Sequence, residues 1–118
     1  MNSTVTGREA KRTAELYLRQ QGLQLVQRNY RARTGEIDLI MERGSLLAFV
    51  EVRYRGNPNY GSGADSISRS KQRKIINTAH LFLQKHCKNN DPRWNEYRFD
   101  VVSIGNEINW IPGAFTLD

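Results

Sequence analysis

The chain has 118 residues, 38% of them hydrophobic and 25% charged, which predicts one globular domain over residues 1–118 and excludes a disordered chain. No apolar run approaches the roughly 20 residues that span a bilayer, and residues 1–7 lack the apolar core of a signal peptide, so we expect a cytoplasmic protein without membrane contacts. The single Cys87 excludes an intramolecular disulfide and a multi-cysteine zinc site, and the net charge of +6 favours a polyanionic partner.

The first half of the chain is expected to form one helix and three strands. Apolar residues at helical spacing predict a helix over residues 7–21, and Gly22 is well placed to end it. Apolar, strand-forming runs predict strands over residues 23–30, 36–42 and 46–54. The segment Arg43-Gly44-Ser45 between the last two strands is typical of a hairpin turn.

The second half adds a long loop, a helix and one or two strands. Residues 57–65 hold Pro58, Gly61 and Gly63 and are expected to form a loop. A helix is predicted over residues 68–87, then a strand over 98–104 and a short last strand over 108–111. The order is therefore α-β-β-β-α-β with an optional final strand, which indicates an α/β protein with helices packed on a mixed sheet.

Acidic residues interrupt two apolar strands of the predicted hairpin. A two-residue turn at Gly44-Ser45 places Asp38 opposite Glu51. Alternation along the strands then sorts the side chains onto two faces. The face expected to pack in the core carries Ile37, Leu39, Met41, Ala48, Val50 and Val52. The other face carries Glu36, Asp38, Ile40, Phe49, Glu51 and Arg53.

Two carboxylates directly opposite each other need compensation, because their repulsion costs up to about 1 kcal/mol even on a wet surface. Mg²⁺ is commonly held by one or two carboxylates and leaves its other positions to water and phosphate. The pair therefore indicates a divalent metal site formed by Asp38 and Glu51. The alternative is an ion-pair network in which Arg53 and a nearby lysine neutralise the carboxylates.

The second helix offers polar residues on its apolar side. Continuing its apolar stripe backwards from Ile75 reaches Lys71 and Gln72, so both are expected to face the sheet near its acidic residues. The alternative is that Lys71 extends along the surface to water and that the Gln72 amide is solvated.

Four segments of the chain together resemble the YraN family of bacterial proteins, a largely uncharacterised family of candidate endonucleases related to archaeal Holliday-junction resolvases. These segments are "GEIDLI", "FVEVRYR", "SRSKQRKI" and "RFDVVSIGNEINWI". The resemblance covers about residues 7 to 115. An acid followed by Glu-x-Lys on adjacent strands is also the signature of the PD-(D/E)xK nuclease superfamily. The resemblance implies a restriction-endonuclease-like fold that cuts DNA, branched or structured DNA in particular, with Mg²⁺ or Mn²⁺; relatives of this fold often act as homodimers.

The resemblance also assigns site residues. It implies that Asp38, Glu51 and the Val52 carbonyl bind the metal, while Arg53, Lys71 and Gln72 complete the catalytic group. Arg53 stands where the superfamily signature has lysine, and an arginine cannot lose its proton to act as a general base. Many relatives also carry a first-helix glutamate, at a position that Lys11 occupies here. In this chain Glu15 or Glu9 would have to supply that metal ligand.

Arginine supplies 13 of the 18 basic residues, and its planar fork fits phosphate. We expect nucleic-acid contacts from five residues: Arg33, Arg55, Tyr60, Arg69 and Arg73. The competing function is a nuclease fold that binds nucleic acid or a protein partner without cutting, which Arg53 in place of lysine favours. Asp100, in the middle of a predicted strand, is left with two alternatives: a contact with the first helix or a place in the site.

Overall fold

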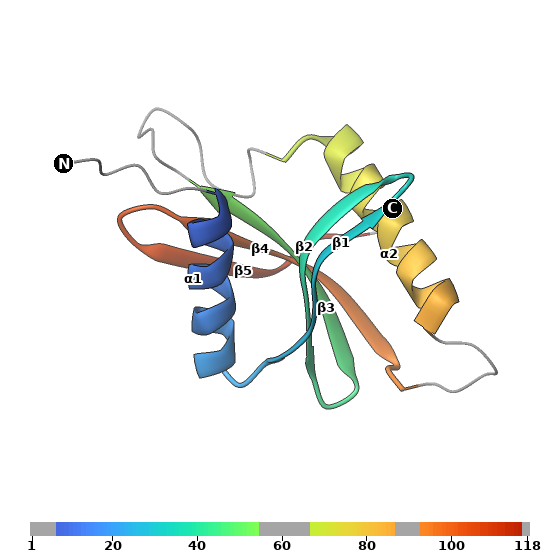
Figure 1. The fold of residues 1–118 in the computed structure, drawn as a ribbon, viewed down its shortest axis with the longest axis horizontal. Helices are drawn as coiled ribbons and strands as arrows, with labels where there is room; N and C mark the ends of the chain where they lie inside the picture. The colour runs from blue at the N-terminus through green and yellow to red at the C-terminus, as the bar shows by residue number, and fades with distance from the viewer. Residues whose placement is uncertain (1–6, 55–66, 87–92, 117–118) are drawn as a thin grey trace.

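The computed structural model describes residues 7–54, 67–86 and 93–116, which form two helices and five strands (Figure 1). Their bounds are α1 Gly7–Gln20, β1 Gln24–Ala32, β2 Gly35–Arg43, β3 Leu46–Tyr54, α2 Arg69–His86, β4 Glu96–Ile104 and β5 Ile108–Phe115. The strands lie in the order β1-β2-β3-β4-β5, and only β3 and β4 run parallel. The expected mixed sheet with the nuclease-like order is confirmed, and β5 completes it as a fifth strand. No helix in these ranges is long and apolar enough to cross a membrane.

A glycine marks the end of α1, and a capping serine marks the start of α2. Gly22 has φ +98°, a conformation that glycine adopts freely, and the next amide, that of Leu23, returns to the Leu18 carbonyl at 3.0 Å. At the start of α2 the Ser68 hydroxyl accepts a hydrogen bond from the Lys71 amide at 3.1 Å, which is the geometry of an N-cap. The observed helices are slightly shorter than predicted: α1 ends one residue earlier, and α2 begins one residue later and ends one residue earlier.

The β2–β3 hairpin has the predicted register. Arg43 pairs with Leu46 and Leu39 pairs with Val50, so Gly44 and Ser45 form a two-residue turn. Gly44 has φ +59°, in the region that favours glycine. The ladder between the two strands ends at the Leu39–Val50 pair, one step before Asp38 and Glu51.

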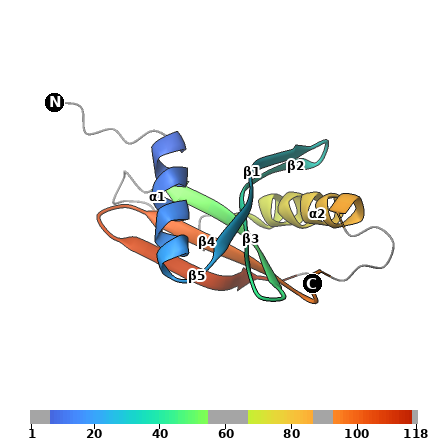
Figure 2. The same ribbon diagram turned by 60° about the horizontal axis from the view of Figure 1, so that its bottom comes forward.

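The sheet has a core on both faces, so the prediction that one face of the hairpin packs and the other carries the acids was wrong. α1 covers one face, and the cluster beneath it includes Leu39, Met41, Ala48 and Val50. α2 covers the other, and the cluster beneath it includes Ile37, Ile40, Leu47, Phe49 and Phe82. Figures 1 and 2 show the two helices apart on the twisted sheet, with the tip of the β1–β2 hairpin beside α2. The prediction failed because α2 buries the face that was expected to be the acidic one.

Strand alternation also breaks down next to Asp38. Asn29 lies opposite Asp38 in the register set by neighbouring pairs, and it has φ +50°, a left-handed conformation that asparagine adopts more readily than most residues. Ile37 packs under α2, whereas Asp38 and the next residue, Leu39, both lie toward α1. The local distortion turns the Asp38 carboxylate to the side where α1 approaches the sheet.

Candidate active site

Asp38 and Glu51, the acidic pair, come from adjacent strands and are both buried, with 9% and 6% of their surfaces exposed. Asp38 Oδ2 accepts a hydrogen bond from the Val52 amide at 2.8 Å. That amide lies beyond the last ladder pair of β2 and β3, so the strand backbone itself positions the carboxylate.

The acidic pair is electrostatically strained. Burial raises the pKa of Glu51 to about 7, and the negative charge of Asp38 beside it acts in the same direction. Lys71 opposes this effect with its Nζ 3.5 Å from Glu51 Oε2, and Arg53 opposes it from 4.0 Å. The two cations therefore compensate the buried carboxylates only in part.

Lys11 reaches the same place from α1. Its Nζ lies 3.4 Å from Asp38 Oδ1 and 3.6 Å from Glu36 Oε2, and it donates a hydrogen bond to Asn29 Oδ1 at 3.0 Å. Within the described ranges, Glu36 Oε2 is buried and accepts no hydrogen bond. The sequence analysis did not predict this contact, although counting along the first helix had already reached the position of Lys11.

Glu15 is engaged elsewhere. It accepts hydrogen bonds from Arg28 at 2.7 and 2.9 Å and from Arg19 at 3.0 Å, and the Arg28 bonds hold the pKa of this carboxyl below its ordinary value. Glu9 is exposed on the first turn of α1. Across the residues that the structure describes, no three acidic, histidine or cysteine side chains gather closely enough to hold a metal ion. The protein ligands on offer at the acidic pair are therefore two carboxylates.

The structure separates the two residues expected from the second helix. Lys71 extends to Glu51 as described. The side-chain amide of Gln72 instead donates a hydrogen bond to the Ile67 carbonyl at 3.1 Å, at the start of α2. The expected nucleic-acid contacts are exposed where they are described: Arg33 lies in the β1–β2 turn, and Arg69 and Arg73 lie on α2. Arg55 and Tyr60 lie outside the described residues.

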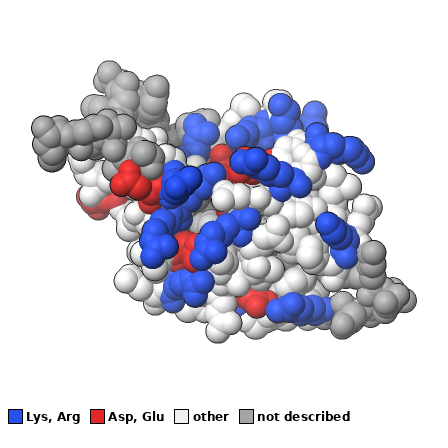
Figure 3. Space-filling model, in the orientation of Figure 1, with Lys and Arg blue, Asp and Glu red and all other residues white. Residues whose placement is uncertain are grey.

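A basic cleft of about 420 Å³ opens between α1 and β1, and Asp38 forms part of its wall. We define the basic cleft by its cationic lining residues, Arg8, Lys11, Arg12, Arg28 and Arg31. Figure 3 shows Lys and Arg side chains gathered around acidic ones over this part of the surface. The sequence gives no periodic signal for the cleft, because its two walls come from separate elements. Chemically, it offers several cations beside a buried carboxylate.

Asp100 belongs to neither of the places expected for it. Its buried carboxylate accepts hydrogen bonds from Arg98 at 2.8 and 3.0 Å, from Trp110 Nε1 at 3.0 Å and from the Gly113 amide at 3.0 Å. These donors lie on β4 and β5, so Asp100 ties the last hairpin together.

Comparison with known proteins assigns a family. The family model described as "Uncharacterised protein family UPF0102" matches residues 10–104. The chain belongs to UPF0102. A UPF0102 protein of Saccharophagus degradans is 48% identical over 115 residues, covering 96% of this chain and 94% of the relative. Another, from Vibrio campbellii, is 40% identical over 114 residues, covering 93% and 91%. This is the family of the YraN resemblance, so that expectation is confirmed. The UPF0102 name itself carries no activity.

Proposed function

We propose that this UPF0102 chain is a metal-dependent endonuclease that hydrolyses DNA phosphodiester bonds, with branched or structured DNA as its substrate. The observation that carries the proposal is the acidic pair, two buried carboxylates from adjacent strands at the wall of a basic cleft. Proteins seldom bury two like charges together without a partner ion, because the charged forms are costly in a low-dielectric setting.

The residues fit a hard divalent cation. Mg²⁺ is usually bound by one or two carboxylates while water and substrate phosphate fill its other positions, which matches the two carboxylates of the acidic pair. Asp38, Glu51 and the Val52 carbonyl would hold Mg²⁺ or Mn²⁺, and the ion would supply a water of lowered pKa and a charge that polarises the phosphoryl oxygen. The raised pKa of Glu51 supports this assignment, because a cation would favour its ionised form.

The cations around the pair have separate tasks in the proposed reaction. Lys71, 3.5 Å from Glu51, offsets the negative charge that develops on the phosphoryl group, and Arg53 clamps a phosphate oxygen. Gln72 fixes the start of α2, which carries Lys71, through its bond to the Ile67 carbonyl. The basic cleft would hold the phosphates next to the scissile bond, and the exposed Arg33 would extend this contact along β1 and β2.

A second candidate function is a module that binds nucleic acid or a protein partner without cutting. Two observations favour it: Arg53 cannot act as a general base, and the Lys11 ammonium already lies 3.4 Å from Asp38. In this alternative Lys11 and Lys71 neutralise the acidic pair permanently, and no metal binds.

Cleavage of a panel of linear, single-stranded and four-way-junction DNA with Mg²⁺ or Mn²⁺ distinguishes the two functions. We expect cutting by the wild type, no cutting by Asp38→Asn or Glu51→Gln, and unchanged cutting by Glu107→Gln, which alters an exposed acid on the β4–β5 turn. DNA binding without metal-dependent cutting by the wild type would reject the endonuclease and favour the binding module. Sedimentation of the same samples would test for the homodimer that cutting two strands favours.

A further inference from the structure

A row of stacked aromatic rings crosses the α2 side of the sheet. Phe49 of β3 and Phe99 of β4 stack with ring centroids 5.6 Å apart and planes at 26°, and Phe115 of β5 stacks on Phe99 at 5.2 Å and 18°. Phe49 is 1% exposed, whereas the outer two rings are only partly buried. Because α2 packs mainly over β1 and β2, the two outer rings stay only partly buried.

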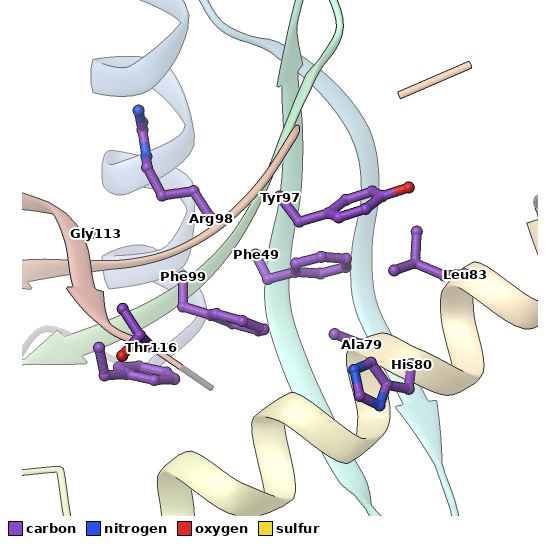
Figure 4. Close-up of a pocket in the computed structure, with 10 residues that line it drawn as sticks. Phe49, Ala79, His80, Leu83, Tyr97, Arg98, Phe99, Gly113 and Thr116 are labelled. Carbon is purple, nitrogen blue, oxygen red and sulfur yellow. The ribbon is translucent and has the colours of Figure 1, made fainter. Parts of the chain in front are cut away.

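Beside these rings lies a cavity of about 250 Å³. Figure 4 shows Phe49, Phe99 and Tyr97 on its sheet side, with His80 and Leu83 of α2 opposite them. The walls are mainly apolar, and the volume suits one flat ring system rather than a large ligand.

A second hollow of about 260 Å³ continues from the first along α2. His80 and Thr116 line both hollows. The rest of the second hollow is walled by side chains of the helix: the polar and basic Arg69, Gln72, Arg73 and Asn77, and the apolar Ile76. We call the two hollows together the α2 trough. Arg73 and His80 are seven residues apart on the helix, so the basic end lies about 10 Å from the aromatic end.

The basic end of the trough carries two arginines, Arg69 and Arg73. Among the residues that the structure describes, neither Arg69 nor Arg73 has an acidic side chain within ion-pair distance. Two arginine forks side by side match the oxygens of a phosphate. The side-chain N–H of Gln72 donates to the Ile67 carbonyl, and the side-chain oxygen of Gln72 can accept a further hydrogen bond.

We propose that the α2 trough binds one unpaired nucleotide of a nucleic-acid strand, with its phosphate on Arg69 and Arg73 and its base at the aromatic end beside Phe99 and Phe115. An anion next to a flat ring is the chemistry that distinguishes this ligand from an apolar peptide or a bare anion, and stacking on aromatic side chains tolerates any base. The choice of a nucleic acid rests on the proposed function. In duplex DNA the bases are stacked within the helix and cannot enter, so the trough selects strands with unpaired positions.

The orientation of α2 connects the trough with the acidic pair. Lys71 extends from one side of the first turns to Glu51, while Arg69 and Arg73 line the trough on another side of the same turns. A strand with its unpaired nucleotide in the trough therefore passes the helix turn that carries Lys71. The trough would position substrates whose unpaired nucleotide lies close to the bond to be cut.

The test is binding in EDTA, so that no strand is cut, of a fluorescent single-stranded oligonucleotide and of a blunt duplex. We expect Phe115→Leu to weaken single-strand binding about tenfold, within the range for the loss of one stacked base, and to change duplex binding less than about twofold. Arg73→Gln should weaken single-strand binding by a similar factor. Lys85→Gln, which removes the same charge from the far end of α2, should leave it within about twofold of the wild type.

The outcomes separate the trough from the proposed function. Unchanged single-strand binding by a folded Phe115→Leu or by Arg73→Gln overturns the trough, whereas cleavage by the acidic pair can still stand. Absence of any strand binding by the wild type overturns both proposals. A wild-type dimer that Phe115→Leu converts to a monomer would also overturn the trough, because a second copy of the chain would then cover the aromatic end.

Discussion

The ammonium of Lys11 lies 3.4 Å from the carboxylate of Asp38, so a residue of the first helix already holds a positive charge where a metal ligand is proposed. The Lys11 ammonium also donates a hydrogen bond to Asn29. This asparagine has a left-handed backbone conformation and lies opposite Asp38 in the sheet. Through Lys11, the first helix therefore influences how strongly the acidic pair attracts a further cation.

Replacing Lys11 with methionine should tighten Mn²⁺ binding. The substitution removes a like charge from the neighbourhood of the bound ion, and we expect a gain of about tenfold, near the lower end of the energies for charges separated by about 4 Å. A titration with Mn²⁺ that is monitored by calorimetry or electron paramagnetic resonance measures the affinity. Lys85→Met is the matched control, and weaker binding by the Lys11 variant would mean that Lys11 supports the metal site.

The metal-free protein should lose stability as the pH rises from about 5 to 8. Glu51 has a pKa of about 7 in the folded protein, above the ordinary value of 4.5. Between these values the folded state binds more protons than the unfolded state, so the free energy of unfolding falls with increasing pH. The contribution is present below the unfolded pKa and is lost as the pH passes the folded one.

Glu51→Gln should remove this pH dependence, because glutamine does not titrate. In urea unfolding with EDTA, the free energy of unfolding of the variant, relative to that of the wild type, should rise by about 2 to 3 kcal/mol as the pH increases from about 5 to 8. Parallel stability curves for the two proteins would contradict the raised pKa.

Lys71→Gln should lower the rate of metal-dependent cleavage about 100-fold, the usual effect of removing one group that stabilises transition-state charge. Single-turnover assays with saturating enzyme isolate this step from binding. Lys74→Gln changes an exposed lysine on the next turn of α2 and should cut at the wild-type rate. Equal losses in both variants would assign Lys71 to general attraction of the nucleic acid.

Asp100→Ala should destabilise the protein by about 3 to 5 kcal/mol, because the change leaves the partly buried Arg98 guanidinium, the Trp110 ring N–H and the Gly113 amide without their buried acceptor. Glu107→Ala, on the exposed turn of the same hairpin, should have little effect. Chemical denaturation of both variants provides the comparison. A small loss for Asp100→Ala would mean that water replaces the carboxylate.

Local sequence patterns were sufficient to predict the helices and strands and to predict that Asp38 and Glu51 lie close together. Helical spacing and Gly22 determined α1, and the two-residue turn at Gly44 set the β2–β3 register that brings Asp38 and Glu51 to one end of the ladder. These features depend on residues close together in the sequence, where spacing is a reliable guide.

Tertiary docking determined what the sequence could not show. Alternation predicted a single packed face, but α2 covers the second face as well, and the distortion at Asn29 turns Asp38 toward α1. The contact between Lys11 and Asp38 and the two walls of the basic cleft join elements far apart in the chain. No periodicity within one element reports such contacts.

Both outer strands of the sheet are irregular, with a consequence for self-association. In β1 the register shifts between Leu25 and Gln27, and Asn29 is left-handed; β5 contains Pro112, which has no amide hydrogen, and Gly113 at φ +63°. Such interruptions prevent a strand of another molecule from adding to the sheet edge. We therefore expect the folded chain to resist edge-to-edge aggregation even at high protein concentration.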